Sequence, residues 1–247
     1  MDTFSRNETP SLLDEAQSIT DAQEIINVDT LDYSKVYDNC AYESYINNFE
    51  RCNKKKLFYR FIKRSFDIFS SLFALILLSP VFLIVAILIK LESKGPIIFK
   101  QTRVGKNGKP FSCYKFRSMK ITAPKNCPTN ELGDNKDYVT RVGRFLRKVS
   151  IDELPQLWCC LIGTMSVIGY RPLIPNEQEC NDMRERLGVF VMRPGITGYA
   201  QVVGRDDVYY KNKAILDAEY VKRASLWCDI KILFRTVAVV ISRRGAK

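Results

Sequence analysis

The hydrophobic pattern is dominated by an uncharged run at residues 68–89, which is 22 residues long. A helix of that length reaches ~30 Å, the thickness of the hydrocarbon core of a bilayer. Two features oppose a simple span. Ser79 and Pro80 interrupt the run, and proline kinks a helix because it removes a hydrogen bond. Basic residues also flank the run on both sides, whereas a spanning helix usually has them on one. The pattern favours, slightly ahead of a span, a re-entrant helix over residues 65–91 that breaks at Ser79-Pro80.

Short β-prone runs follow at residues 96–99 and 110–116. Between them, the sequence Gly-Lys-Asn-Gly at 105–108 predicts a hairpin, because Asn-Gly accepts the positive φ angles of a tight turn. Residues 121–139 are polar and rich in turn formers, so we expect a loop there.

Thr140 is expected to cap a short amphipathic helix. Apolar residues follow it at helical spacing, at Val142, Phe145, Leu146 and Val149, and bases take the other faces. Such a helix suits either the headgroup layer of an anionic membrane or the surface of a protein core. The apolar stretch at 227–242 predicts another buried or interfacial helix. Together the elements predict an α+β, mostly helical fold: a monotopic membrane protein with a re-entrant helix, a small β-hairpin and interfacial amphipathic helices.

The net charge of +11 is unevenly divided along the chain. Residues 1–50 hold eleven acids and two bases, a net −9, so the remainder carries +20 from 36 bases and 16 acids. We expect residues 1–50 to form an acidic, flexible extension. Residues 51–64 hold seven bases and no acid, and form a basic flank suited to membrane phospholipids.

The sequence contains no histidine, which excludes a Ser-His-Asp triad, an imidazole base and a His-based zinc site. The eight cysteines include no CxxC pair, so zinc-ribbon spacing is absent too. No signal peptide is recognisable, so reduced thiols on the cytoplasmic side are expected. The roles of acid, base and nucleophile then fall to carboxylates, cysteines, lysines or tyrosines.

Two adjacent carboxylates, Asp152 and Glu153, are the most suggestive candidates. Ser150 and Glu153 fit a capping box, although Pro155 allows the helix to begin a residue or two later. Either register places both carboxylates in or beside the first turn, where the helix dipole favours their ionised form. Asp152 could then attack phosphorus, and the pair could hold Mg²⁺. On the motif alone, a capping box without chemistry is the simpler interpretation.

Basic residues in or next to turns make a catalytic role for the carboxylate pair more plausible than a capping box alone. Arginine forks suit phosphate oxygens, and loop placement lets backbone amides join them. Beside a carboxylate pair on a membrane-bound chain, they indicate a diphosphate substrate. The candidates for binding phosphate are Lys115, Arg117, Arg147, Arg171, Arg193 and Arg205.

These motifs occur in an order that resembles the bacterial sugar transferase family, the monotopic phosphoglycosyl transferases. The resemblance extends from about Lys63 to Ser242, roughly 180 of the 247 residues. Its segments are the basic flank with the broken helix, Gln101-x-Arg103-x-Gly105, Lys115-Phe-Arg-Ser-Met119, Asp152-Glu-Leu-Pro-Gln-Leu-Trp158, Gly163-Thr-Met-Ser-Val-Ile-Gly169, Arg171-Pro-Leu, Arg193-Pro-Gly-Ile-Thr-Gly-x-Ala-Gln-Val202, Gly204-Arg205, Asp217, Tyr220 and Asp229.

The resemblance implies a re-entrant helix on the cytoplasmic face of the inner cell membrane, with a catalytic domain over residues 92–247. It implies that Asp152 attacks the β-phosphate of a UDP-sugar, releases UMP and carries a phosphosugar that polyprenyl phosphate then accepts. This reaction initiates glycan assembly. By the same resemblance Glu153 serves Mg²⁺ binding and proton handling. Phosphate charge is then held by Lys115, Arg147, Arg171 and Arg205.

Two positions depart from the family's pattern. Tyr170 stands where proline usually precedes Arg-Pro, and Asp206 follows Gly-Arg where asparagine is common. Tyr170 could reshape the loop that bears Arg171, and Asp206 adds a negative charge beside Arg205. Both departures concern substrate binding, while the implied class of reaction is unchanged.

Two other classes of function remain open at this point. The basic body could belong to a non-catalytic protein that binds a membrane surface. A nucleic-acid partner is not expected, because no nucleic-acid motif is present. A metal-dependent glycosyltransferase that releases UDP is the other alternative, with Asp134-Asn-Lys-Asp137 and Asp206-Asp207 as its nearest candidate motifs. No residue pattern indicates the transferred sugar or the oligomeric state.

Overall fold

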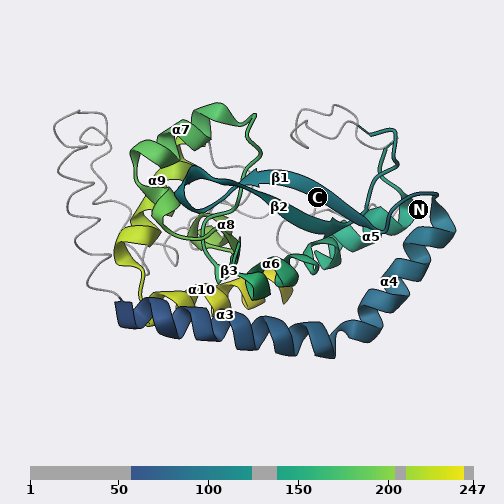
Figure 1. Ribbon diagram of the computed structural model, residues 1–247, viewed down its shortest axis with the longest axis horizontal. Coiled ribbons are helices and arrows are strands. Elements are labelled where there is room, and N and C mark those ends of the chain that lie inside the picture. The colour runs from purple at the N-terminus through teal and green to yellow at the C-terminus, as the bar shows by residue number, and fades with distance from the viewer. Residues whose placement is uncertain (1–56, 124–137, 204–209, 242–247) are drawn as a thin grey trace, which may run out of the picture.

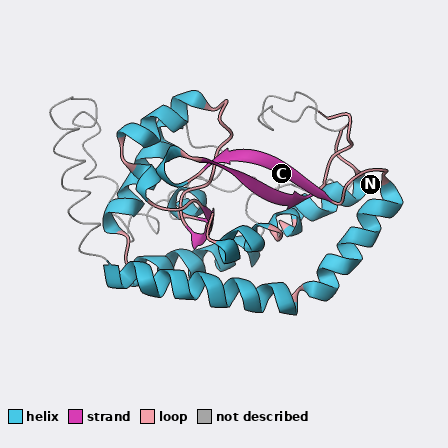
Figure 2. Cartoon of the chain, in the orientation of Figure 1, coloured by secondary structure: helices cyan, strands magenta, loops and turns pink. Residues whose placement is uncertain are grey.

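A computed structural model describes residues 57–123, 138–203 and 210–241. Within them the fold is α+β and mostly helical, as predicted, with two small two-stranded sheets (Figure 2). The acidic extension at 1–50 lies outside the described residues, as do most of the predicted loop at 121–139 and both Arg205 and Asp206.

A bent pair of helices forms one edge of the molecule (Figure 1). Helix α3 (Leu57–Leu77) and helix α4 (Ser79–Glu92) meet at a bend of 60°. Pro80 lies in the first turn of α4, where its missing N–H has no helical acceptor to lose. The helix therefore breaks where Ser79-Pro80 predicts. No single helix among the described residues is long and apolar enough to cross a membrane, and only the two halves of this pair together reach the required length and composition.

The helix pair exposes many of its large apolar side chains, and α3 buries polar ones. The two buried residues of α3 are Asp67 and Ser71, whereas Phe69 is 71% exposed. On α4, Leu91 is 79% exposed and Leu83 also faces outward. A large exposed apolar surface is typical of a site that contacts a membrane or another protein.

The predicted hairpin is present. Strand β1 (Ile98–Val104) pairs antiparallel with strand β2 (Pro110–Phe116), from Ile98↔Phe116 to Val104↔Pro110. Asn107 and Gly108 at its tip have φ angles of 57° and 68°, which explains the Asn-Gly signal. The first strand was predicted only in part: residues 98–99 belong to it, but it begins two residues later than predicted and extends to Val104, because the polar residues 100–103 end the apolar run.

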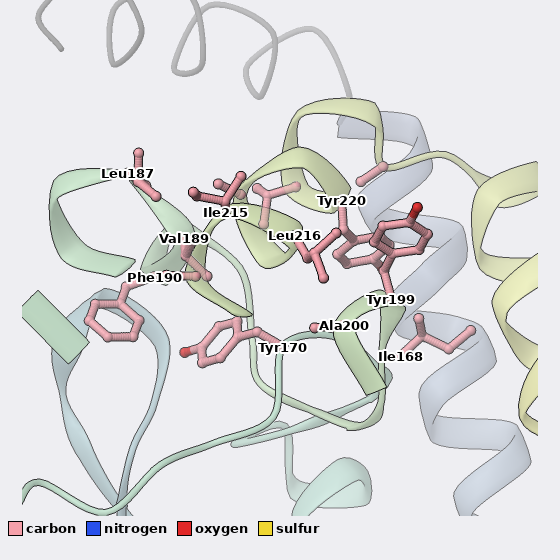
Figure 3. Close-up of a cluster of buried hydrophobic side chains, with 14 of the residues drawn as sticks. Ile168, Tyr170, Leu187, Val189, Phe190, Tyr199, Ala200, Ile215, Leu216 and Tyr220 are labelled. Atoms are coloured by element: carbon pink, nitrogen blue, oxygen red, sulfur yellow. The ribbon is translucent and has the colours of Figure 1, made fainter. Parts of the chain in front are cut away.

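The main hydrophobic core lies between the second sheet and the C-terminal helices. Strands β3 (Ser166–Ile168) and β4 (Gly195–Thr197) pair in parallel. Around them lie α7 (Gln178–Arg186), the short helix η7 (Val189–Val191), α8 (Tyr199–Val203), α9 (Tyr210–Arg223) and α10 (Leu226–Ile241). Figure 3 shows part of this core, including Tyr170, Val189 and Tyr199. The sequence did not predict the second sheet, because three-residue strands are too short to show alternation.

Helix α5 (Arg141–Lys148) begins at the predicted cap: the Thr140 hydroxyl accepts a hydrogen bond from the Gly143 amide at 2.9 Å. Leu146 is buried against α4, whereas Phe145 points outward. The interpretation as a helix packed on the protein core is therefore confirmed, whereas contact with a headgroup layer stays a prediction. The Glu92 carboxylate, at the end of α4, accepts from the amides of Arg141 and Val142 at 2.6 and 3.0 Å, which fastens the helix pair to α5.

Candidate active site

The two adjacent carboxylates lie in a single 3-10 turn, η6 (Ile151–Glu153), which precedes helix α6 (Gln156–Ile162). The predicted capping box is wrong. Ser150 has a left-handed φ of 55° and its side chain caps no amide. The regular helix begins only after Pro155, and the Glu153 side chain is committed to cations from other parts of the chain. The carboxylates are thus held by long-range contacts rather than by a local cap.

Glu153 is fixed by two bases. Its Oε1 accepts hydrogen bonds from Lys115 Nζ at 2.6 Å and from Arg171 Nη2 at 3.0 Å. Lys115 belongs to β2, and Arg171 belongs to the irregular segment that follows β3. Burial by itself would raise the pKa of Glu153, but the charges and hydrogen bonds of Arg171 and Lys115 bring that pKa well below the ordinary glutamate value. Glu153 is therefore a permanently ionised carboxylate at neutral pH.

Asp152 has a different environment, although it is the next residue. It is 8% exposed, and within the described part of the chain no hydrogen bond or ion pair engages its carboxylate. Burial raises the pKa of Asp152, with the opposing charge of Lys115 as the next influence. A carboxylate that is desolvated and not tied up by hydrogen bonds is available as a nucleophile.

Arg147 completes the charged surroundings of Asp152. It projects from α5, and its Nε donates to the Ser118 hydroxyl at 2.8 Å. The charge of Arg147 lowers the pKa of Asp152, as does that of Arg171. The structure thus brings three of the predicted bases to the two carboxylates, from β2, from α5 and from the segment after β3.

A hollow of about 230 Å³, including its open mouth, lies beside Glu153. Three bases and one acid line it, so its charge favours an anionic ligand. One face of the hairpin supplies much of this lining, because side chains of paired strand residues point to the same side. The lining residues are Arg103, Cys113, Lys115, Glu153, Gln156, Arg171 and Pro172.

Comparison with known proteins identifies the family to which this arrangement belongs. Residues 58–243 match the family described as bacterial sugar transferase. The chain belongs to the bacterial sugar transferase family. The resemblance predicted from the motifs is thereby confirmed, and every described residue of the candidate site lies inside the matched range.

Relatives within the sugar transferase family act on several sugars. The chain is 42% identical over 203 residues to the undecaprenyl-phosphate galactose phosphotransferase of Salmonella typhimurium, covering 76% of this chain and 42% of the relative. It is 42% identical over 185 residues to the UDP-glucose:undecaprenyl-phosphate glucose-1-phosphate transferase of Escherichia coli, covering 72% and 40%. It is 38% identical over 200 residues to the exopolysaccharide production protein ExoY of Rhizobium meliloti, covering 74% and 87%. The chain therefore spans less than half the length of the first two relatives.

Two of the predicted phosphate-binding residues lie elsewhere in this sugar transferase family member. The buried Arg117 guanidinium donates to the carbonyls of Lys94 and Ser93 at 2.8 and 2.7 Å, at the end of α4. Arg193 Nε donates to the Gly163 carbonyl at 2.7 Å, at the end of α6. The last carbonyls of a helix have no helical partner, which explains both contacts. Neither residue reaches the hollow, and Arg205 lies outside the described residues.

The lining also includes residues that the sequence analysis did not assign to the site, chiefly Arg103 and Gln156. Both occur in the motifs that carry the family resemblance, Gln101-x-Arg103 and Asp152-Glu-Leu-Pro-Gln156. The signal was therefore present, but in a strand and in a helix rather than in loops.

No group of three or more Cys, Asp or Glu side chains within the described ranges could enclose a metal ion. Mg²⁺, however, is commonly held by one or two carboxylates, with water and substrate phosphates supplying the other oxygens. Asp152 has an unengaged carboxylate, and Glu153 binds its two bases through Oε1. The oxygens of the pair are thus of the kind that can bind Mg²⁺.

Proposed function

We propose that this chain transfers a sugar-1-phosphate from a UDP-sugar to polyprenyl (undecaprenyl) phosphate and thereby initiates the assembly of a glycan such as an exopolysaccharide, a capsule or a glycoconjugate. Its family and the names of its relatives support this class of reaction. The observation that carries the proposal is the contrast within the carboxylate pair. Asp152 is buried and unengaged, whereas Glu153 is held by Lys115 and Arg171 at the edge of a basic hollow.

In the first step, a carboxylate oxygen of Asp152 attacks the β-phosphorus of the UDP-sugar. A bond forms between that oxygen and phosphorus, and the bond from the β-phosphorus to the bridging oxygen breaks. UMP departs with the bridging oxygen and its electron pair. The sugar phosphate is left on Asp152 as a mixed anhydride.

In the second step, a phosphate oxygen of the polyprenyl phosphate attacks the same phosphorus. The bond to Asp152 breaks, its carboxylate is regenerated, and the product is a polyprenyl diphosphosugar. The soluble donor and the lipid acceptor can then use a single site in turn, which suits an active site beside a membrane.

The bases of the site hold the phosphate charge. Lys115 and Arg171 lie at the hollow and Arg147 lies near Asp152, so each can approach a phosphate oxygen during transfer. Asp152 and Glu153 would hold Mg²⁺ with the diphosphate, where the ion would neutralise the charge of the leaving UMP. Ionised Glu153 also keeps the two bases oriented when no substrate is bound.

A re-entrant arrangement of α3 and α4 at the cytoplasmic face of the cell membrane completes the proposal. Both ends of the helix pair are attached to one body: Lys63 Nζ, near the start of α3, bonds Asp229 at 2.8 Å, and Glu92, at the end of α4, binds the amides that begin α5. Two ends fastened to one body support a segment that enters and leaves on the same side of a bilayer. The apolar outer face of the pair would then lie among phospholipids.

The identity of the released nucleotide tests the proposal. The purified chain is incubated in detergent with Mg²⁺, polyprenyl phosphate and a panel of UDP-sugars, and the products are separated. UMP released with one donor, together with a polyprenyl diphosphosugar, supports the proposal and identifies the sugar. UDP release supports a glycosyltransferase, and no turnover with any donor supports a membrane-binding protein; either of these results contradicts the proposal.

A further inference from the structure

Three successive peptide carbonyls are held in the segment that carries Arg171. The carbonyl of Arg171 accepts from Arg184 Nη1 at 2.9 Å, and the carbonyl of Pro172 accepts from Arg103 Nη1 at 3.1 Å. The carbonyl of Leu173 accepts from the Val104 amide at 2.9 Å. The segment belongs to no helix or strand, so these bonds take the place of regular structure in fixing its backbone.

Arg184 approaches this segment from the core. Its side chain is 1% exposed, and Nη2 donates to Asp217 Oδ2 on α9 at 2.5 Å. Its guanidinium lies 5.3 Å from the centre of the Tyr170 ring. A buried arginine is destabilising unless its charge is paired, so the ion pair with Asp217 and the bond to the Arg171 carbonyl define its place.

The same contacts account for the presence of a tyrosine at position 170. Its ring is buried between Arg184 and Phe190, whose ring centre lies 5.6 Å away, and it faces the core in Figure 3. The departure from the family's usual proline therefore adds packing to the segment and leaves Arg171 directed at Glu153.

Arg103 approaches from the opposite side, on β1. Its Nη2 donates to Gln101 Oε1 at 2.6 Å, which orients the guanidinium toward the Pro172 carbonyl. Arg103 also lines the hollow, so two roles are open to it: direct contact with an anionic ligand, or support of the segment. The hydrogen bonds to Pro172 and Gln101 each use one N–H of a terminal nitrogen of Arg103. They favour the second role, in which Arg103 supports the segment.

We propose that Arg103 and Arg184 are positioning residues that act through Arg171. By holding the two carbonyls from opposite sides, they fix the backbone from which the Arg171 guanidinium reaches Glu153 Oε1 at 3.0 Å. The inference rests on the proposed function, in which Arg171 holds the phosphate of the donor. A shift of the segment by about 1 Å would then lower transfer by up to about a hundredfold.

A double-mutant cycle separates support from direct contact. Arg103→Met removes the donors of Arg103 at similar length, and Arg171→Ala removes the group on which it acts. The expected result is a fall in kcat/KM for UMP release of about ten- to hundredfold on the wild-type background, and of less than about twofold on the Arg171→Ala background. Effects that multiply would overturn the inference, because Arg103 would then act without Arg171.

Two further variants sharpen the cycle. Arg103→Lys keeps the positive charge but cannot reach Pro172 and Gln101 together, so its kcat/KM should fall almost as far as that of Arg103→Met. Retention of full activity by Arg103→Lys would indicate that charge alone matters and would contradict the inference. Lys100→Gln is the matched control, because Lys100 is an exposed base of the same strand. Its kcat/KM should be unchanged.

Hydrogen exchange gives a readout that does not require turnover. The Val104 amide, which donates to Leu173, should exchange faster in Arg103→Met and in Arg184→Lys than in the wild type, and at the wild-type rate in Lys100→Gln. Unchanged exchange in both arginine variants would overturn the inference. If the wild type turned over no UDP-sugar, the proposed function would fail, and the exchange rates would still decide whether the two arginines hold the segment.

Discussion

The bent helix pair exposes most of its apolar side chains, whereas the rest of the described protein, here called the body, buries many of its own. Helix α4 buries only Val85 and Ile89 of its 14 residues, and the buried residues of α3 are polar. In the body, by contrast, apolar side chains from Ile168 to Ile232 form one core, part of which is drawn in Figure 3. The comparison teaches that hydropathy marks an apolar segment, whereas packing decides whether that segment faces a core or an apolar surrounding.

Polar contacts join these two regions where apolar packing would be expected. Asp67 of α3 accepts hydrogen bonds from the Ser166 hydroxyl and the Val167 amide, each at 2.9 Å. Arg64 donates to the carbonyls of Cys160 and Leu161, at the end of α6, at 2.6 and 2.8 Å. Because α6 begins soon after Glu153, these contacts also set the place of the active site relative to the helix pair.

The strongest way to break the comparison is to place charges on the outward face of α4. Each aspartate at the centre of a membrane helix costs about 2.5–3.5 kcal/mol, so Leu83→Asp combined with Ile87→Asp should weaken partition into lipid vesicles by at least about a thousandfold. Flotation of the full chain with vesicles measures this. Leu83→Ala combined with Ile87→Ala is the control and should still float. A double-aspartate variant that floats like the wild type would show that this face does not lie in lipid.

A truncation inside the body should act on stability instead. Ile232 is fully buried, so Ile232→Ala should lower the free energy of unfolding in detergent by about 2–5 kcal/mol. Leu83→Ala removes a similar side chain from the outward face and should change it by less than about 0.5 kcal/mol. Denaturant unfolding of the two variants measures the difference. Equal losses would mean that both regions bury their apolar residues alike.

The junction, meaning the polar contacts that join α3 to the body, should contribute less to the free energy of unfolding. Arg64→Met removes two charge-assisted hydrogen bonds to α6 and should lower the free energy of unfolding by about 1.5–3 kcal/mol. Arg60, one turn earlier on α3, is exposed, so Arg60→Met should lower it by less than about 0.5 kcal/mol. The same unfolding experiment compares them, and a loss in Arg60→Met as large as that in Arg64→Met would argue against a specific junction.

The smallest effect concerns the pH dependence of the body's active site. Burial raises the pKa of Asp152, and Arg147 opposes that rise with its positive charge. Asp152 must be ionised to attack, so kcat/KM should fall as the pH drops through this raised pKa. Arg147→Gln removes a charge that lowers the pKa, so the acidic limb of the pH profile should move to higher pH.

Arg144→Gln is the control for that profile. Arg144 is an exposed base of the same helix, and its replacement should leave the acidic limb in place. A limb that stays in place in Arg147→Gln as well, or that moves to lower pH, would contradict the assignment of the limb to Asp152.

Local features of the sequence predicted local structure well. Asn107-Gly108 predicted the hairpin, Thr140 the start of α5, and Ser79-Pro80 the break between the two helices, because in each case the chemistry acts within a few residues. Membership of the family also followed from collinear motifs. These features need no knowledge of the partners of a residue in space.

Features that depend on distant partners could not be predicted. The capping-box prediction at Ser150 failed because Glu153 is bound by Lys115 and Arg171, which lie 38 and 18 residues away along the chain. Arg117 and Arg193 are of a residue type that binds phosphate, but in the fold their guanidinium groups bind backbone carbonyls at the ends of helices. The sequence shows where the basic side chains lie along the chain, whereas the fold determines which oxygen atoms they bind.

The central claim, a phosphosugar on Asp152, is tested most directly by labelling the protein. The chain is mixed with a UDP-sugar carrying ³²P in its β-phosphate and with Mg²⁺, without polyprenyl phosphate, and the protein is then isolated and digested. The account predicts label on the peptide that contains Asp152, its loss when polyprenyl phosphate is added, and no label in Asp152→Asn, which should also be inactive. Label on Asp152→Asn, or full activity of that variant, would contradict the account.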